Sequence, residues 1–423
     1  MGIQRNNFSM LRKRRSSLDT DSAMPCVAVL VDTSTGWGRG IVQGIVKYAR
    51  LHGPWHLWVE PRGQSEWLRP PSGWAGDGII ARVSSRRMAG QLKALRRPVV
   101  NVSGIEIAGF NWPRVTNDVE VAGRLAGQYF LDRGFCHFAY CGWLPFSHVQ
   151  RHYRAFLETL GCREEDCAVY LLGTRNSASA GWRKQQGRLA DWLRGLPKPV
   201  AVLTWALQGL SVLEACKTAG LRVPEEVAIL CGDNDELLYE AVAPPLSGIA
   251  LPTEQIGFEA AAALETLMSG RPETPATCYV RPTHIVTRQS TDILAVQDAD
   301  LAAAIRFIRQ RAASPVRVSD ILRAVPLSRR SLERKFLQVL RRSPADEIRR
   351  VHLDRARQLL CDTDLPIPRV AALSGFGSPE YLSFAFKRQE GLTPAKYRSS
   401  VRVHSRKMDI SYEAWGQISL GSL

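Results

Sequence analysis

The sequence predicts two Rossmann-like α/β lobes followed by a smaller domain made only of helices. Three observations lead to this fold class. Short apolar runs alternate with amphipathic segments from Cys26 to about residue 285, which is the order of βαβ units around parallel sheets. The crossovers are too many for one small doubly wound sheet, which favours two lobes with a cleft between them. Strand patterns then stop near residue 297, and helical periodicity continues to Arg398.

The strands of the α/β part are expected where short apolar runs carry no charge. They are Cys26–Val31, Gly78–Ala81, Val99–Val102, Phe138–Cys141, Val169–Leu172, Val200–Leu203 and Val227–Cys231. Amphipathic helices fit the segments that follow. They are Gly40–Leu51, Val119–Arg133, Tyr153–Gly161, Gln185–Gly195, Leu210–Ala219 and Thr253–Ser269. Because parallel strands end at one edge of a sheet, polar residues after these strands are candidates for a binding site.

The helical part begins with a helix-turn-helix pattern. Ser319–Val325 forms a short helix, Pro326 interrupts it, and Ser328 is suited to cap the next helix. The apolar stripe of that next helix has helical spacing and consists of Leu332, Phe336 and Leu340.

The same pattern then occurs a second time. Ile367–Ser374 leads through Gly375-Phe376-Gly377 into a helix that Ser378 caps, with Pro379 in its first turn. A longer amphipathic helix, Pro344–Leu360, joins the two units. Two recognition helices arranged in this way suit successive major grooves of DNA, which are about 34–36 Å apart.

Positive charge is concentrated in this helical part. The whole chain has 56 Lys and Arg against 40 Asp and Glu, a formal net charge of +16. Residues 301–400 alone hold 20 basic and 9 acidic residues, a net charge of +11. A compact basic block predicts a domain that binds a polyanion such as double-stranded DNA. The alternative for any single charge is a solvated helix face.

Outward-facing charges on these helices divide into two groups. Arg330 and Arg334 have the fork geometry for guanine edges, and Glu333 can accept a hydrogen bond from cytosine. Other basic residues are better placed for phosphates, which position a domain without specifying sequence. They are Arg341, Arg342, Arg388 and Lys396.

Residues 300–398 resemble the DNA-binding domain of AraC-type transcription regulators. The residues that carry the resemblance are Gly375-Phe376, Ser378, Tyr381, Phe386-Lys387, Gly391, Thr393-Pro394 and Tyr397-Arg398. The resemblance implies base-reading positions in both units. They are Arg329, Arg330, Glu333 and Arg334 in the first unit and Ser378, Pro379, Glu380, Ser383 and Lys387 in the second. Pro379 and Glu380 offer no side-chain donor, which leaves backbone positioning as an alternative role for the second unit.

The α/β part resembles the sugar-binding domains shared by periplasmic binding proteins and LacI-type repressors. The segments that carry this resemblance are Trp37-Gly38-Arg39, Gly76-Asp77-Gly78-Ile79-Ile80, Val223-Pro224-Glu225-Glu226-Val227, Cys231-Gly232-Asp233-Asn234 and Arg288-Gln289-Ser290-Thr291-Asp292. From Cys26 to Arg398 the chain is similar to the xylose-operon regulators among AraC-type proteins. This implies a homodimer that binds a DNA operator and a small sugar effector, with no cofactor. The lack of a secretory segment and of a disulfide framework indicates the cytoplasm.

The domain boundaries expected on this basis are as follows. A basic tail at residues 1–25 precedes a periplasmic-binding-protein-like sugar-sensing domain at 26–285, a linker at 286–299, a double helix-turn-helix domain at 300–400 and a second tail at 401–423. The alternative for the first tail is an arm that contacts DNA through Arg12 to Arg15.

Polar and aromatic residues that follow the expected strands are the candidates for sugar binding. They are Trp37, Arg39, Asp118, Arg151, His152, Trp205, Asp233 and Asn234, with His148 nearby. The resemblance gives ligand roles to Trp37, Arg39, Asp118, Asp233 and Asn234. Two alternatives stay open: Trp205 packs between lobes, and Asp233 with Asn234 forms an Asx turn.

Two departures from the family pattern concern the ligand. Thr204-Trp205-Ala206 stands where these sensors commonly have an Asp, and the expected arginine is either Arg151, shifted by one position, or replaced by His152. These departures leave open a sugar other than xylose, or a constitutive regulator with a degenerate pocket. A sugar-binding protein with a tail domain that binds nucleic acid non-specifically is a further alternative.

Other function classes find little support. Nine cysteines without CxxC spacing argue against a disulfide framework or zinc ribbon. The chain has no secretory h-region, no uninterrupted apolar run of about 18 residues, no phosphate-binding loop and no hydrolase or zinc-protease motif. We therefore expect no membrane span, no metal, and no enzyme or catalytic residue.

Overall fold

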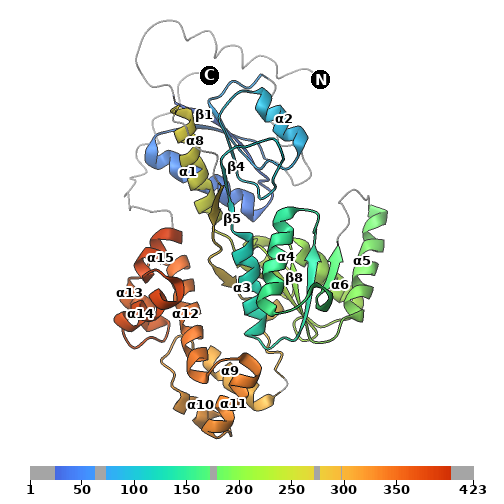
Figure 1. Cartoon of the computed structure of the whole chain (residues 1–423), viewed down its shortest axis with the longest axis vertical. Helices are drawn as coiled ribbons and strands as arrows, with labels where there is room; N and C mark the ends of the chain where they lie inside the picture. The colour runs from blue at the N-terminus through green and yellow to red at the C-terminus, as the bar shows by residue number, and fades with distance from the viewer. Residues whose placement is uncertain (1–23, 62–72, 172–178, 271–276, 297, 402–423) are drawn as a thin grey trace, which may run out of the picture.

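The fold consists of two α/β lobes and a helical domain that lies at one end, beside the second lobe (Figure 1). A computed structural model describes residues 24–61, 73–171, 179–270, 277–296 and 298–401. The two expected tails, including Arg12 to Arg15, therefore lie almost wholly outside the described residues. Among the described residues, no helix is both long and apolar enough to cross a membrane.

The first lobe is built on a parallel six-stranded sheet in the order β11-β5-β4-β3-β1-β2. Its strands are β1 (Cys26–Leu30), β2 (His56–Val59), β3 (Gly78–Ala81), β4 (Val99–Asn101), β5 (Arg114–Asn117) and β11 (Thr277–Val280). Side chains alternate across the sheet, so Val27 and Val29 enter the core with α1 (Gly36–His52) and α8 (Thr253–Met268). Ala28 and Leu30 enter the opposite core with α2 (Arg86–Ala94).

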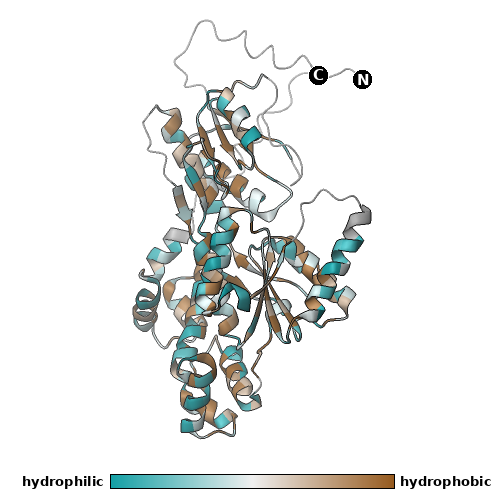
Figure 2. Ribbon diagram, turned by 45° about the vertical axis from the view of Figure 1, so that its right-hand side comes forward, coloured by the Kyte–Doolittle hydropathy of each residue, from teal (hydrophilic) through white to brown (hydrophobic). Residues whose placement is uncertain are grey.

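The second lobe has a sheet in the order β12-β10-β9-β8-β6-β7. Its strands are β6 (His137–Gly142), β7 (Ala168–Leu171), β8 (Val200–Thr204), β9 (Val227–Cys231), β10 (Ser247–Ala250) and β12 (His284–Val286). Only β12 runs antiparallel to its neighbour, β10. Apolar residues fill the strands of both sheets (Figure 2), and the central strands β8 and β9 are wholly buried.

Helices cover both faces of the second sheet. Those on one face are α3 (Val119–Leu131) and α4 (Ser147–Leu160), and those on the other are α5 (Ser179–Gly195) and α6 (Gln208–Ala219). The short elements of the lobe are α7 (Glu236–Glu240) and the 3-10 turns η2 (Glu164–Asp166) and η3 (Gln289–Thr291). The two-lobed α/β fold expected from the sequence is thus confirmed.

The helical domain has two separate apolar cores that share one helix. Its helices are α9 (Ala299–Gln310), α10 (Val318–Ala324), α11 (Arg329–Leu340), α12 (Pro344–Asp362), α13 (Ile367–Leu373), α14 (Pro379–Glu390) and α15 (Pro394–Val401). Ile348 and Val351 of α12 lie in the core of the first unit, and Ala356 and Leu360 lie in that of the second. Ser328 caps α11 as the sequence indicates, because its hydroxyl accepts the Ser331 N–H at 3.2 Å.

The stretch expected as a linker, residues 286–299, is largely built into the second lobe. Ser290 and Thr291 are fully buried. The Ser290 hydroxyl donates to the Ile229 carbonyl at 2.7 Å and accepts the Ser247 N–H at 2.9 Å. These hydrogen bonds hold the segment against β9 and β10, so the connection to α9 is short.

Candidate ligand cleft and DNA interface

A cavity of about 150 Å³ lies between the two lobes, at the carboxyl ends of their strands. The first lobe lines it with Asp32, Thr35, Trp37, Arg82, Ser103, Gly104, Ile105, Thr116 and Asn117. The second lobe lines it with Val119, Ala122, His148, His152, Trp205, Ala206, Gly232, Asp233 and Leu251. Drug-sized ligands occupy about 300–1,000 Å³, whereas a cavity of about 150 Å³ holds benzene. The cleft therefore suits a ligand with a single ring.

Two histidines one helical turn apart on α4 form part of the second-lobe wall. Their rings form T-shaped contacts with the ring of Trp205, at centroid distances of 5.3 Å for His148 and 5.2 Å for His152. Burial lowers the pKa of His148 to about 4, helped by Arg82, and that of His152 to about 3. Both rings are thus neutral at neutral pH, and a neutral imidazole offers one donor and one acceptor.

Several polar atoms of this wall have no partner among the described residues. They are Nδ1 of His148, Nε2 of His152 and Oδ1 of Asn117. The other ring nitrogen of His152 lies 3.0 Å from the Tyr140 hydroxyl. Burying a polar atom without a partner costs about 1–3 kcal/mol. Because buried polar atoms normally have partners, these three mark the wall of the cleft as a candidate site for a polar ligand.

The first-lobe wall combines an ion pair with an aromatic ring. Arg82, which follows β3, donates to the carboxylate of Asp32, which follows β1, at 3.0 Å. Trp37 in the first turn of α1 supplies an apolar face. Paired polar groups beside an aromatic face are what recognition of a sugar ring requires.

Asp233 of the second lobe is engaged with a neighbour of its own. Its carboxylate accepts the hydroxyl of Tyr239. Burial raises the pKa of Asp233 to about 6, although this hydrogen bond opposes the shift.

The two lobes touch at the edge of the cavity. The N–H of Gly36, at the start of α1, donates to Asp235 of the second lobe at 2.7 Å. Arg39 also faces Asp235, at 3.6 Å, and donates to the carbonyl of Ser34. Arg39 therefore joins the lobes instead of lining the cavity.

Of the sugar-binding candidates, Trp37, His152, Trp205 and Asp233 lie in the cavity wall, and four others do not. These four are Arg39, Asp118, Arg151 and Asn234. Each is engaged elsewhere. Asp118 caps α3 by accepting the Val121 N–H at 3.1 Å, Arg151 donates to the Tyr279 hydroxyl at 3.2 Å, and Asn234 accepts from Arg288 at 2.8 Å.

Sequence reasoning missed further residues of the wall. Asp32, Arg82, Ser103 and Asn117 all stand at or just after the ends of first-lobe strands. The strand-end rule that selected Trp205 and Asp233 was sufficient to find them.

The first candidate recognition helix, α11, presents its charges to solvent. Leu332, Phe336 and Leu340 are buried, and Arg330 and Arg334 are exposed on the opposite side. Arg329 donates to Glu333 at 3.0 Å, one turn along the helix. Arg330 and Arg334 are thus the side chains that are accessible for base edges.

The second candidate recognition helix, α14, is less basic and more apolar on its surface. Ser378 caps it by accepting the Tyr381 N–H at 3.2 Å, and Pro379 occupies its first turn. Glu380 and Lys387 are exposed, and Ser383 is half-buried. Phe384 is 64% exposed. Phe384 is not among the base-reading residues expected from the sequence, although an apolar side chain suits the methyl group of thymine.

The four phosphate candidates do not share one environment. Arg341, Arg388 and Lys396 are exposed. Arg342 instead lies between the domains, where its guanidinium pairs with Asp132 of α3 at 2.7 Å and with Glu347 at 2.7 Å. The expectation of a phosphate contact for Arg342 is therefore wrong, because two carboxylates already bind it.

Comparisons with known proteins agree with this architecture. Residues 128–291 match the family of periplasmic binding protein-like domains, and residues 321–400 match a helix-turn-helix domain. The xylose operon regulatory protein of Escherichia coli is 27% identical over 382 residues, covering 88% of this chain and 96% of that protein. The chain is a helix-turn-helix transcription regulator.

Two further relatives extend over nearly the same length of the regulator. The xylose operon regulatory protein of Haemophilus influenzae is 26% identical over 383 residues, which is 88% of the regulator and 97% of that protein. The solved structure of a xylose-binding transcription activator covers 89% of the regulator and 98% of its own chain, with a TM-score of 0.57 and 24% identity. The latter establishes a shared fold.

Proposed function

We propose that the regulator binds a specific DNA operator and that a small sugar, xylose or a related monosaccharide, controls this binding from the cleft between the lobes. The observation that carries the proposal is a ring-sized cavity in whose wall two histidine nitrogens and one amide oxygen have no partner among the described residues, in a chain that also has a double helix-turn-helix domain. Similarity to xylose operon regulatory proteins along 88% of the chain supports both parts. A homodimer in the cytoplasm fits repeated half-sites.

The cleft offers each kind of contact that a monosaccharide requires. The neutral rings of His148 and His152 and the amide oxygen of Asn117 take the hydroxyl groups. Trp37 and Trp205 cover the C–H surface of the ring. Arg82 and Asp32 supply a fixed donor and acceptor pair on the first-lobe wall.

DNA reading is assigned to α11 and α14. Arg330 and Arg334 form bidentate contacts with guanine, while Arg341, Arg388 and Lys396 bind phosphates and set the register. The sugar alters DNA binding only if its affinity differs between two arrangements of the regulator. Since residues from both lobes line the cleft, a bound sugar contacts both lobes and favours the arrangement in which they lie close together.

The test is selection from a random-sequence duplex library by the full-length protein at fixed salt, with and without a mixture of pentoses and hexoses. Enrichment of a direct or inverted repeat that depends on sugar is the expected result. If no sequence is enriched in either condition, the basic helices bind DNA only through phosphates, and the proposed operator recognition is wrong.

One observation favours a second candidate, a constitutive regulator whose pocket no longer takes a ligand. Trp205 occupies the wall where related sensors commonly have an acidic residue. Calorimetry with individual pentoses and hexoses separates the two candidates. Heat of binding for any of them rules out the constitutive regulator, and its absence for all of them rules out the sensor.

A further inference from the structure

Helix α3 runs from the cleft to the helical domain. Val119 and Ala122, in its first turn, line the cavity. Asp132 ends the helix at the other side, where its side chain is only 6% exposed. The 13 residues between these ends correspond to about 20 Å. One rigid element therefore spans the distance between the two functional regions.

Helices α3 and α4 approach each other most closely at two glycines of α3. A Cβ atom at Gly123 would lie 2.2 Å from the carbonyl oxygen of His152, and one at Gly127 would lie 2.9 Å from the Cβ of Thr159. His148 and His152, which face the ligand, belong to the same helix α4. Because close-packed backbones do not slide freely, a shift of α4 at the cleft moves α3 as well.

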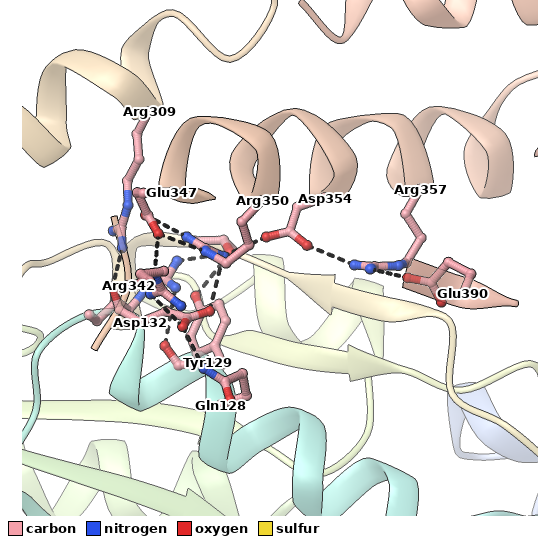
Figure 3. Close-up of polar contacts among 12 residues, drawn as sticks. Gln128, Tyr129, Asp132, Arg309, Arg342, Glu347, Arg350, Asp354, Arg357 and Glu390 are labelled. Atoms are coloured by element: carbon pink, nitrogen blue, oxygen red, sulfur yellow. Dashed lines mark hydrogen bonds and ion pairs between the residues drawn. The ribbon is translucent and has the colours of Figure 1, made fainter. Parts of the chain in front are cut away.

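Asp132 holds the helical domain through three arginines (Figure 3). Its carboxylate pairs with Arg342 at 2.7 Å and with Arg350 at 3.0 Å. Its carbonyl accepts a hydrogen bond from Arg309 at 3.0 Å. Gln128, one turn earlier in α3, donates to the same carboxylate at 2.7 Å and fixes its orientation.

The ion pairs continue along α12 to the second recognition helix (Figure 3). Arg342 and Arg350 both bind Glu347, which is fully buried. Arg350 also pairs with Asp354 at 2.6 Å, and Asp354 pairs with Arg357 at 2.7 Å. Arg357 then binds Glu390, the last residue of α14. A displacement of Asp132 thus acts on α12, which belongs to both helix-turn-helix units.

We propose that Asp132 is the positioning residue that couples ligand in the cleft to DNA binding. This proposal rests on the proposed function above. Asp132 touches neither ligand nor DNA, so its removal leaves each binding site intact and weakens only their dependence on one another. The coupling is measured as the ratio of operator dissociation constants with and without sugar, and such ratios are typically about 5–150-fold.

The experiment compares full-length wild type with Asp132→Asn, using D-xylose as the sugar and the enriched duplex as operator. We expect the ratio to fall to less than about twofold in Asp132→Asn, while calorimetry gives a D-xylose dissociation constant within about threefold of wild type. Asp191→Asn is the matched control, because it removes an acidic partner of an arginine, Arg194 at 2.7 Å, on the exposed surface of α5. The control keeps the wild-type ratio.

A second variant approaches the same contact from the helical domain. Arg350→Gln removes a partner of Asp132 without changing α3, and it is expected to lower the ratio in the same way, with circular dichroism showing native helix content. The double variant lowers the ratio no further than either single variant.

The outcomes separate the two proposals. A wild-type ratio in both folded variants shows that Asp132 has no coupling role, whatever the sugar does. A wild-type protein that binds D-xylose without any change in operator affinity overturns the coupling itself. If wild type binds neither D-xylose nor an operator, the proposed function fails first and the role of Asp132 fails with it.

Discussion

The cleft and the domain interface are both rich in buried polar groups, but they satisfy these groups differently. In the cleft, ring nitrogens of His148 and His152 and the oxygen of Asn117 have no partner within the described residues. At the interface, Asp132 and Glu347 are each shared by Arg342 and Arg350. The unpartnered atoms of the cleft therefore suit a polar ligand, whereas these four side chains of the interface bind one another and hold two domains together.

The largest effect on stability is expected at the domain interface. Glu347→Ala leaves two arginines short of a buried carboxylate, and losing one partner of a buried pair costs about 3–5 kcal/mol. We expect the free energy of unfolding of the helical domain to fall by this amount in denaturant titration. Glu254→Ala, which removes an exposed partner of Lys47, is the control and changes stability by less than about 1 kcal/mol. Equal effects would erase the contrast between buried and exposed pairs.

The histidines of the cleft make stability depend on pH. Their pKa values are lowered in the folded state, to about 4 for His148 and about 3 for His152, so the unfolded state binds more protons below pH 6.5. Their contribution is complete above about pH 7 and is lost as the pH falls from 6.5 toward 4. Between pH 7 and 5 each should cost about 2 kcal/mol of unfolding free energy.

The histidine contribution is isolated by a variant, because Asp233 acts in the opposite direction. The raised pKa of Asp233, about 6, favours the protonated folded state in acid. Denaturant titrations of wild type and His152→Gln at pH 7 and pH 5 are compared. The loss on acidification should be smaller by about 2 kcal/mol in His152→Gln, and an identical loss in both would show that His152 is not a buried neutral ring.

The charged side chains of the DNA-binding face, such as Arg334 and Lys396, are exposed to solvent. Their removal should therefore change DNA binding and hardly change the free energy of unfolding. Arg334→Ala is expected to weaken operator binding about tenfold and to relax preference at one base pair, since a bidentate contact is worth about 1–3 kcal/mol. Lys396→Ala should weaken all duplexes similarly and lower the salt slope by about 1. Binding titrations against single-base variants at several salt concentrations distinguish the two. A uniform loss for Arg334→Ala would assign it to phosphate.

The smallest effect concerns Trp205, whose two interpretations differ in what they change. As part of the ligand wall, Trp205→Ala should weaken sugar binding about fivefold, the equivalent of about 1 kcal/mol of aromatic contact. As a packing residue between lobes, it should lower the melting temperature and leave the sugar dissociation constant unchanged. Calorimetry and thermal melting of the same variant decide between them.

Sequence patterns predicted most of the fold where burial is complete. The central strands β8 and β9 are apolar throughout and were found nearly to the residue. The strands β2, β5, β10, β11 and β12 were missed, because three or four residues with polar members, such as Arg114 and Thr116 in β5, show no clear period. The first turns of α4, which hold His148 and His152, were also missed.

Residues of the site could be predicted only where their position directly after a strand places them in the cavity wall. Trp205 and Asp233 follow strands and lie in the cavity wall. Arg342 reads as a surface arginine on a basic helical domain, yet its partner Asp132 comes from another domain, far earlier in the chain. No local pattern records such a pair. Contacts between domains, such as the pair of Arg342 and Asp132, therefore cannot be predicted from local sequence patterns.

The position of α12 in two cores also has a consequence for the spacing of bases in the operator. Because one continuous helix carries both reading units, the angle between α11 and α14 is fixed by packing. B-DNA turns once in about 10–10.5 base pairs. Each base pair inserted between the segments that α11 and α14 read therefore rotates one segment by about 35° relative to the other. The helical domain cannot follow that rotation without disrupting one of its two apolar cores. An insertion of about half a turn places the segment read by α14 on the far side of the double helix.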